Sequence, residues 1–433
     1  MCLFCIACGK KVRLNVLKAK KNEKVIDHNY NSHPVHRFCQ GIPEQYLTTA
    51  ANNNPELKAS FNEYMAALEK VPQVKSLPDP RFAFGYFIQP VETRVGPQQA
   101  KLSLDQMFPW FGQLKANADV ATEQAKAKYE AFEETKSKLF FEVKSAYYDL
   151  YFTQKAIDIL LENIAILHTF SELSLIKIEA GLSSSVDQLR IDMDLADLEN
   201  KLALLKDRAW YQTVYFNNLL NVDNSETIYF PDTLPEPDME FSKQDLLDSI
   251  MQNNHRLTKL DYELSAFENK ETAVRKLGAP NINIGIDYIF VGKSDNPNLE
   301  AGLSGKDAIV FPRIGLTIPI YRKKYKSMVQ ETVYQQEAVT DRRVAQTNVL
   351  ESLLEKSYNE YRDANRRLDL FKRQTALARQ AMEILQTDFA TGKTDFVEIL
   401  RMENKLLKYA LELEKARTDK NAAQAFIRYL MGK

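Results

Sequence analysis

The sequence predicts a mixed α/β membrane protein in which amphipathic strands lead into very long helices. Three observations predict this fold class. The chain of 433 residues contains the same succession of motifs twice. Each copy holds two stretches in which apolar and polar residues alternate, which is the period of a strand with two different faces. Each copy also holds a stretch of about 70 residues without Pro or Gly, which only a helix can fill.

The duplication is visible in residues that recur about two hundred positions apart with the same spacing inside each set. The matching residues are Asn53, Asn54, Leu57, Leu77, Pro80 and Gly85 with Asn253, Asn254, Leu257, Leu277, Pro280 and Gly285, and then Gly181, Val186, Leu189 and Arg190 with Gly392, Val397, Leu400 and Arg401. We therefore expect a first repeat over 43–222, a linker over 223–240 and a second repeat over 241–433.

The composition excludes several functional classes. The 57 Lys and Arg residues are balanced by 58 Asp and Glu, and the net charge of -1 provides no basic surface for nucleic acid. The sequence contains no dinucleotide fingerprint, phosphate loop, zinc-protease motif or nucleophile elbow. We therefore expect no enzyme activity, no cofactor and no nucleic-acid partner.

All four cysteines, Cys2, Cys5, Cys8 and Cys39, precede the repeats, in an irregular segment over 1–42. Three interpretations of this segment stay open. The first three cysteines have the spacing of metal ligands, although no fourth donor stands at a fixed position, so we assign no metal site. The apolar run before Cys8 also fits the end of a lipoprotein signal, which would make Cys8 a lipid attachment site. Alternatively, part of the segment results from a wrongly placed start codon.

The strands are predicted in two hairpins, over 81–106 and 281–320. The apolar positions of their first strands are Phe82, Phe84, Tyr86 and Ile88, and then Ile282, Ile284, Ile286, Tyr288 and Phe290. The intervening positions are small or polar, among them Gly85, Asn283, Gly285 and Asp287. Strands of about 9–11 residues with one apolar and one polar face are typical of a transmembrane β-barrel. The alternative is an amphipathic sheet packed on helices.

Four strands leave two open edges, and open edges cannot stand in hydrocarbon because their backbone groups would lack partners. If these strands span a membrane, several copies of the chain must therefore contribute to one closed sheet. We expect the loops 91–99 and 291–307 to face outside, since the longer loops of outer-membrane barrels are extracellular. The helices then lie on the other side.

The long helices are predicted over 113–180 and 323–391. Val143, Leu150, Ile157 and Ile164 recur every seven residues, with Tyr147, Leu160, Leu161 and Leu167 between them, as in a coiled-coil seam. Each long helix ends at a short loop that contains Gly, and a second helix begins near Val186 or Val397. We thus expect helical hairpins over 111–221 and 321–431. The Pro-rich segment between the copies should cross the helices at mid-height.

At this point the chain resembles the TolC-like outer-membrane efflux proteins, from about residue 43 to residue 433. The resemblance is carried by four sequences: Asn-Asn-Pro-Glu-Leu-Lys-Ala at 53–59, Leu-Pro-Asp-Pro at 77–80, Gln-Met-Phe-Pro-Trp-Phe-Gly at 106–112, and Ala-Gly-Leu-Ser at 180–183 with its counterpart Thr-Gly-Lys-Thr at 391–394. The passage at 106–112 is most similar to the branch that works with heavy-metal or cation exporters.

The resemblance implies a homotrimer in the outer membrane of a Gram-negative bacterium. Three chains would supply twelve strands to one transmembrane β-barrel, which a coiled-coil barrel of helices continues across the periplasm. The implied function is a passive exit duct of a tripartite efflux pump, together with an inner-membrane transporter and a periplasmic adaptor protein. The adaptor would dock on the hairpin tips, at Gly181, Leu182 and Ser183 and at Gly392, Lys393 and Thr394.

The family closes the tunnel at these tips with acidic side chains, which the resemblance places at Asp187, Asp395 and Glu398. One helical turn further on, this sequence has Arg190 and Arg401 where an acid would also be expected. The gate would therefore be an acidic ring or a salt-bridged lock. Alternatively, these residues form ordinary ion pairs one turn apart on exposed helix faces.

The main alternative function is a soluble or periplasmic coiled-coil scaffold or adaptor without a channel. Such a protein would explain the helices but would leave the amphipathic strands unexplained. A wide passive duct owes its selectivity to the pump behind it, so the sequence predicts efflux without distinguishing a metal ion from a drug.

Overall fold

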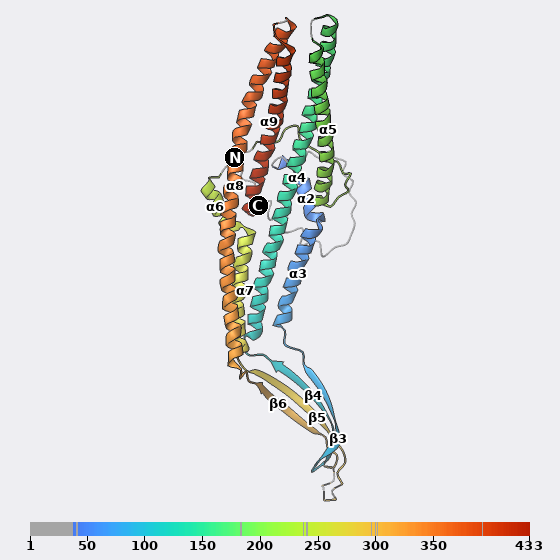
Figure 1. Ribbon diagram of the computed structural model, residues 1–433. Helices are drawn as coiled ribbons and strands as arrows, with labels where there is room; N and C mark the ends of the chain where they lie inside the picture. Colours follow the sequence, from blue (N-terminus) through green and yellow to red (C-terminus); the bar gives the residue numbers. More distant parts are fainter. Residues whose placement is uncertain are drawn as a thin grey trace. The chain divides into compact units, whose positions relative to one another are not determined.

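The computed structural model describes residues 38–39, 42–181, 184–236, 238–239, 241–295, 297–298, 300, 302–391 and 393–433. The interpretations of the first 37 residues, including those of Cys8, fall outside this part. The elements shown in Figure 1 are β1 (Phe38–Cys39), β2 (Ile42–Pro43), α2 (Glu44–Asn53), α3 (Pro55–Lys75), β3 (Arg81–Thr93), β4 (Gly96–Phe108), α4 (Gln113–Glu179), α5 (Ser185–Leu220), α6 (Lys243–Asn253), α7 (His255–Leu277), β5 (Asn281–Val291), β6 (Ala308–Thr317), α8 (Arg322–Ala390) and α9 (Phe396–Leu430).

The same order of elements occurs in both halves: two helices, a strand pair, a long helix and a returning helix. A repeated asparagine explains one matching motif. Asn54 separates α2 from α3, caps α3 by accepting from the Leu57 N–H (3.1 Å), and donates to the Leu219 carbonyl (3.1 Å) near the end of α5. Asn254 caps α7 by accepting from the Arg256 N–H (3.0 Å), and it donates to the Leu430 carbonyl (2.9 Å) at the end of α9. Each asparagine thus provides a hydrogen-bond partner for an N–H in the first turn of one helix and for a carbonyl in the last turn of another.

The helices of Phe38–Lys433 pack side by side in single rows (Figure 1). On one side of the linker the row is α5, α4, α9, α8, and towards the strands it is α3, α4, α7, α8. The two long helices α4 and α8 run through both rows. Each row has two ends, and α8 forms one end of both.

Most of the predicted seam of α4 is buried. Val143, Leu150, Ile157, Tyr147, Leu160 and Leu167 are all less than 9% exposed, and Ile164 packs against the same core. Leu161 was assigned to the seam wrongly, because it is 47% exposed. It follows Leu160 in the sequence, and consecutive helical residues point about 100° apart.

The four long strands form one antiparallel sheet in the order β3-β4-β5-β6. The register places Ile284 beside Gln106 and Ile314, and Gly285 beside Asp105 and Arg313. The predicted alternation of β3 and β5 is therefore observed: their apolar positions share one face, together with Gln106 of β4, and their polar positions share the other. The apolar face is exposed, with Phe82, Phe84, Tyr86, Ile314 and Leu316 all more than 60% exposed. This exposure contradicts the alternative of a sheet packed on helices.

The prediction of an outer loop over residues 91–99 is wrong. Strand β3 continues to Thr93 and β4 already begins at Gly96, so only a two-residue turn separates them. Pro90 and Pro97 flank this turn, and proline cannot donate a hydrogen bond to a strand ladder. The pairing shifts register between Tyr86 and Val91, and this irregularity accommodates Pro90.

Candidate functional site

The first hairpin tip lies between α4 and α5. Helix α4 ends before Gly181, which has a φ of +70°, the left-handed conformation that glycine adopts at helix ends. Helix α5 begins after Ser184, whose hydroxyl accepts from the Val186 N–H (3.2 Å). Leu182 and Ser183, which we expect at the docking surface, lie outside the described residues.

The second tip lies between α8 and α9. The Lys393 N–H donates to the Asp388 carbonyl (2.8 Å), which folds the chain back at the end of α8. Lys393 is exposed, Thr394 is partly buried, and Gly392 lies outside the described residues. Both tips thus lie at the ends of the long helices, on the opposite side from the sheet (Figure 1).

The predicted gate residues lie in the first turns of the two returning helices. Asp187 pairs with Arg190 on α5 (3.3 Å), and Glu398 pairs with Arg401 on α9 (2.5 Å). Asp395 stands at the start of α9 without a side-chain cap. Within one chain these ion pairs run along their own helices, and the arginine side chains are 50% and 60% exposed. Such pairs contribute little in one chain, so a gating role requires that these residues meet in an assembly.

Below the tips, aromatic side chains join the two hairpins. Phe170 of α4 and Phe396 of α9 meet edge to face with their ring centroids 5.6 Å apart. Phe389 of α8 packs against Phe396, and the Lys177 ammonium lies 3.2 Å from the Phe389 ring centroid. Hydrophobic contact and a cation–π interaction therefore hold the hairpins together here. No short-range sequence pattern predicts this cluster, because its members lie far apart in the chain.

A buried polar pair lies deeper between the same hairpins. The Asn163 amide on α4 donates to the Glu403 carboxylate on α9 (2.8 Å), and both residues are at most 7% exposed. Burial, reinforced by the nearby charge of Glu162, raises the pKa of Glu403. No sequence pattern predicts this pair, since each residue occupies an ordinary polar position of a helix.

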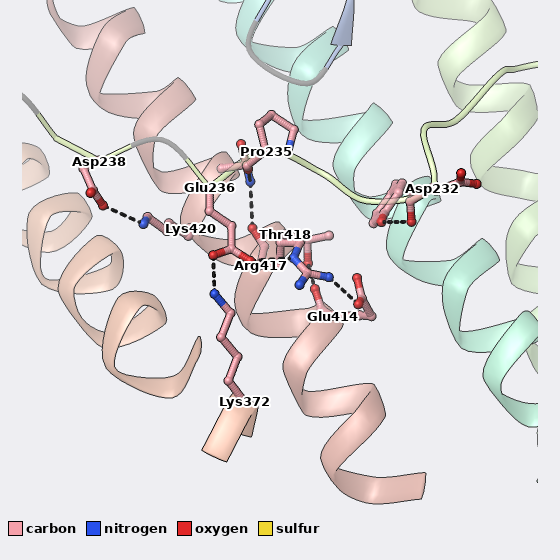
Figure 2. A network of polar contacts seen from close by, with 11 residues as sticks. Asp232, Pro235, Glu236, Asp238, Lys372, Glu414, Arg417, Thr418 and Lys420 are labelled. Atoms are coloured by element: carbon pink, nitrogen blue, oxygen red, sulfur yellow. Dashed lines mark hydrogen bonds and ion pairs between the residues drawn. The ribbon is translucent and has the colours of Figure 1, made fainter. Parts of the chain in front are cut away.

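The linker binds both hairpins, as Figure 2 shows. On the first hairpin, the Tyr147 and Tyr151 hydroxyls donate to the Tyr229 and Asp232 carbonyls (3.0 and 3.3 Å). At the second hairpin, Glu236 forms ion pairs with Arg417 of α9 and with Lys372 of α8.

Two further polar contacts fix the linker to α9. Asn421 donates to the Pro235 carbonyl (2.9 Å), and Lys420 pairs with Asp238 (3.0 Å). The predicted crossing segment is therefore a strap with specific anchors on α4, α8 and α9.

Comparison with known proteins identifies the family to which a chain with these features belongs. The family model of outer membrane efflux proteins matches residues 46–214 and 246–433, which is most of the chain. None of the curated proteins matches the chain in sequence.

Solved structures share the fold at low sequence identity. VceC from Vibrio cholerae superposes with a TM-score of 0.73 at 13% identity, over 90% of this chain and 95% of that chain. The open-state channel MtrE from Neisseria gonorrhoeae gives 0.71 at 12% identity, over 90% and 88%. CusC, whose structures concern transmembrane channel formation, gives 0.71 at 13% identity, over 90% and 91%.

The predicted fold class is thereby confirmed, and the soluble scaffold is not favoured. The predicted location in the outer membrane, with the helices in the periplasm, is confirmed as well. The exposed apolar face of the sheet, the tandem repeat and the paired helical hairpins all agree with the family match, and the chain belongs to the outer membrane efflux protein family.

Proposed function

We propose that three copies of this chain form the outer-membrane exit duct of a tripartite efflux pump. The single observation that carries this proposal is that, among the residues that the structure describes, the sheet and both helical rows each have two open ends. The sheet ends at β3 and β6, the helical row next to it ends at α3 and α8, and the row towards the tips ends at α5 and α8. When copies of the chain are repeated about a common axis, one open end of each layer meets the opposite open end of that layer in the next copy. Such repetition closes the sheet and both helical rows at once.

The side chains at the open ends support this closure. Helix α8 exposes Leu370, Leu377 and Ile384 at intervals of seven residues, and α5 exposes Leu189, Met193 and Leu204 on its length towards the tip. A spacing of seven places the residues of α8 in one stripe along the helix. The exposed apolar residues of α5 and α8 lie at the two ends of the row towards the tips. They would pack against each other if α8 of one copy contacted α5 of the next.

The sheet supports the same assembly. Its apolar face suits lipid and its polar face suits a water-filled lumen, while its edges β3 and β6 require partners inside hydrocarbon. Three copies of four strands would give the twelve-stranded barrel that the family resemblance implies. The duct itself is passive, and a periplasmic adaptor docked on the tips would connect it to an inner-membrane transporter.

The proposal is tested first by mass and conductance. The protein purified in detergent should have the mass of three chains and should form channels in planar bilayers. Leu377→Arg places a charge in the α8 stripe and should reduce the trimer fraction, whereas Arg379→Ala, also exposed on α8, should leave it unchanged. A folded, monodisperse monomer without conductance would contradict the proposed assembly.

The connection to a pump is a separate test. Deletion of the gene should sensitise cells to the pump's cargo, and substitutions at Lys393 and Thr394 should reproduce that sensitivity without lowering the amount of trimer. Cargo tests with metal ions and with drugs in the same strain distinguish the two classes. Full complementation by tip variants would show that the adaptor docks elsewhere.

A further inference from the structure

The charges in the sheet are unevenly distributed. The four strands β3–β6 contain six charged residues, of which Glu92 lies next to the outer turn. The register places the other five, Arg81, Lys101, Asp105, Asp287 and Arg313, on the polar face. This face lies opposite Ile284 and Ile286, so in the proposed barrel it lines the lumen. The five residues are hereafter called the collar.

Four members of the collar form one network across three strands. The Lys101 ammonium on β4 lies 2.8 Å from the Asp287 carboxylate on β5, and the Arg313 Nε on β6 lies 3.3 Å from it. Arg313 also forms an ion pair with Asp105 on β4. Gly285 leaves the space for that pair, since a Cβ there would clash with the Asp105 carboxylate. The charges are therefore held in fixed positions.

The network exposes its cations more than its anions. The Asp287 side chain is only 4% exposed beneath Lys101 and Arg313, which are 34% and 41% exposed. Arg81, which pairs in register with Asp105, is exposed as well. Three cations against two carboxylates leave one net positive charge per chain, and three copies would place three such charges around one lumen.

We infer that the collar is a selectivity element that favours anionic over cationic solutes in the barrel lumen. This inference rests on the proposed trimeric duct and specifies the ion preference of its lumen. Fixed charges of one sign along a pore wall with low-dielectric surroundings raise the local concentration of the opposite ion. The effect extends over about one Debye length, which is about 10 Å at 0.1 M salt and about 30 Å at 0.01 M. The collar should therefore act most strongly at low ionic strength.

The test is the reversal potential of single trimers in planar bilayers under a KCl gradient at low ionic strength. Arg81→Glu reverses one exposed charge per chain and should shift the reversal potential towards the potassium equilibrium potential. Asp105→Asn removes one negative charge per chain and should shift it in the opposite direction. Asn283→Gln, on the same face, changes no charge and should leave the reversal potential at the wild-type value. Both shifts should shrink as the salt concentration rises.

The outcomes separate this inference from the proposed function. Trimers that conduct but show the same reversal potential in wild type, Arg81→Glu and Asp105→Asn would overturn the selectivity role and leave the duct intact. Shifts in the wrong direction would do the same. If the wild-type protein forms no channels, the proposed duct fails first. Arg81→Gln provides a second, milder variant and should give about half the shift of Arg81→Glu, because it removes half as much charge.

Discussion

Asn163 of α4 donates a hydrogen bond to the Glu403 carboxylate of α9 in a site that is almost fully closed to solvent. The pair joins the two hairpins of one chain between the linker and the tips. Leu160, Leu167, Leu400 and Leu407 belong to the surrounding core cluster. The amide is thus a polar partner for a carboxylate in apolar surroundings, and its loss should be costly because a buried acceptor would remain unsatisfied.

We expect Asn163→Ala to destabilise the contact between α4 and α9 by about 1–3 kcal/mol. Glu403→Gln should be tolerated, because a neutral amide still accepts from Asn163 and is easier to bury than a carboxylate. Hydrogen exchange of the two helix segments in the intact trimer measures both effects. Glu199→Gln, at an exposed position of α5, is the control. Equal exchange in Asn163→Ala and wild type would show that the pair is energetically unimportant.

The same pair should respond to pH. Because the pKa of Glu403 is raised in the folded protein, its contribution to stability is fully present below its unfolded pKa and is lost as pH rises through the folded pKa. Exchange near Asn163 should therefore slow as the pH falls towards the ordinary carboxylate range, after correction for intrinsic exchange rates. Glu403→Gln should abolish this dependence. A pH dependence that persists in that variant would assign it to another group.

The attachment of the linker through Glu236 should depend on pH in the opposite direction, and should weaken as the pH falls. Burial opposes ionisation of Glu236, but its bonds to Lys372 and Arg417 prevail and lower its pKa. Its contribution is therefore present above the unfolded pKa and lost as pH falls through the folded pKa. Glu236→Gln should speed proteolysis of the linker at neutral pH. Lowering the pH should then increase the proteolysis rate less in this variant than in the wild-type protein. Glu226→Gln, exposed in the same linker, should cleave like the wild-type protein.

The two faces of the sheet should differ in their tolerance of charge. Ile284→Lys or Ile286→Lys places an ammonium on the apolar face and should cost roughly 2–4 kcal/mol near the middle of the bilayer. Asn283→Lys places the same group on the polar face, where Asn283 now contacts the Thr317 hydroxyl at 3.4 Å, and should assemble normally. The yield of heat-resistant trimer in outer membranes measures the difference. Equal losses on both faces would contradict the assignment of lipid and lumen.

The sequence predicted those parts of the fold that depend on local periodicity. Gly181 marked the end of α4, and the alternation around Ile284 indicated which residues of β5 share a face, because each signal lies within a few residues. The loop at 91–99 was wrong, since the shifted pairing around Pro90 depends on a neighbouring strand. The contacts of Asn163 with Glu403, and of Glu236 with Arg417, join residues 240 and 181 positions apart. No short-range pattern encodes such pairs.

We predict that the charged residues at the tips close the tunnel in the assembled trimer. In one chain, Asp187 and Glu398 bind the arginines one turn away on their own helices. Around a three-fold axis, the first turns of three α5 and three α9 helices would converge, and these exposed pairs could then exchange partners between helices. Pairs that contribute little on a free surface contribute more when they are partly dehydrated, because the effective dielectric constant falls.

We therefore expect the double variant Glu398→Gln, Arg401→Gln to raise the conductance of purified trimers in planar bilayers without changing their mass. The double change removes both charges of one pair, so it adds no net charge at the tip. The matched change in the first repeat, Asp187→Asn with Arg190→Gln, shows whether the two repeats contribute equally. Adaptor binding would open the same gate if it contacts the open tips more strongly than the closed ones. Unchanged conductance in both double variants would place the constriction at another level, with the aromatic cluster around Phe396 as the next position to substitute.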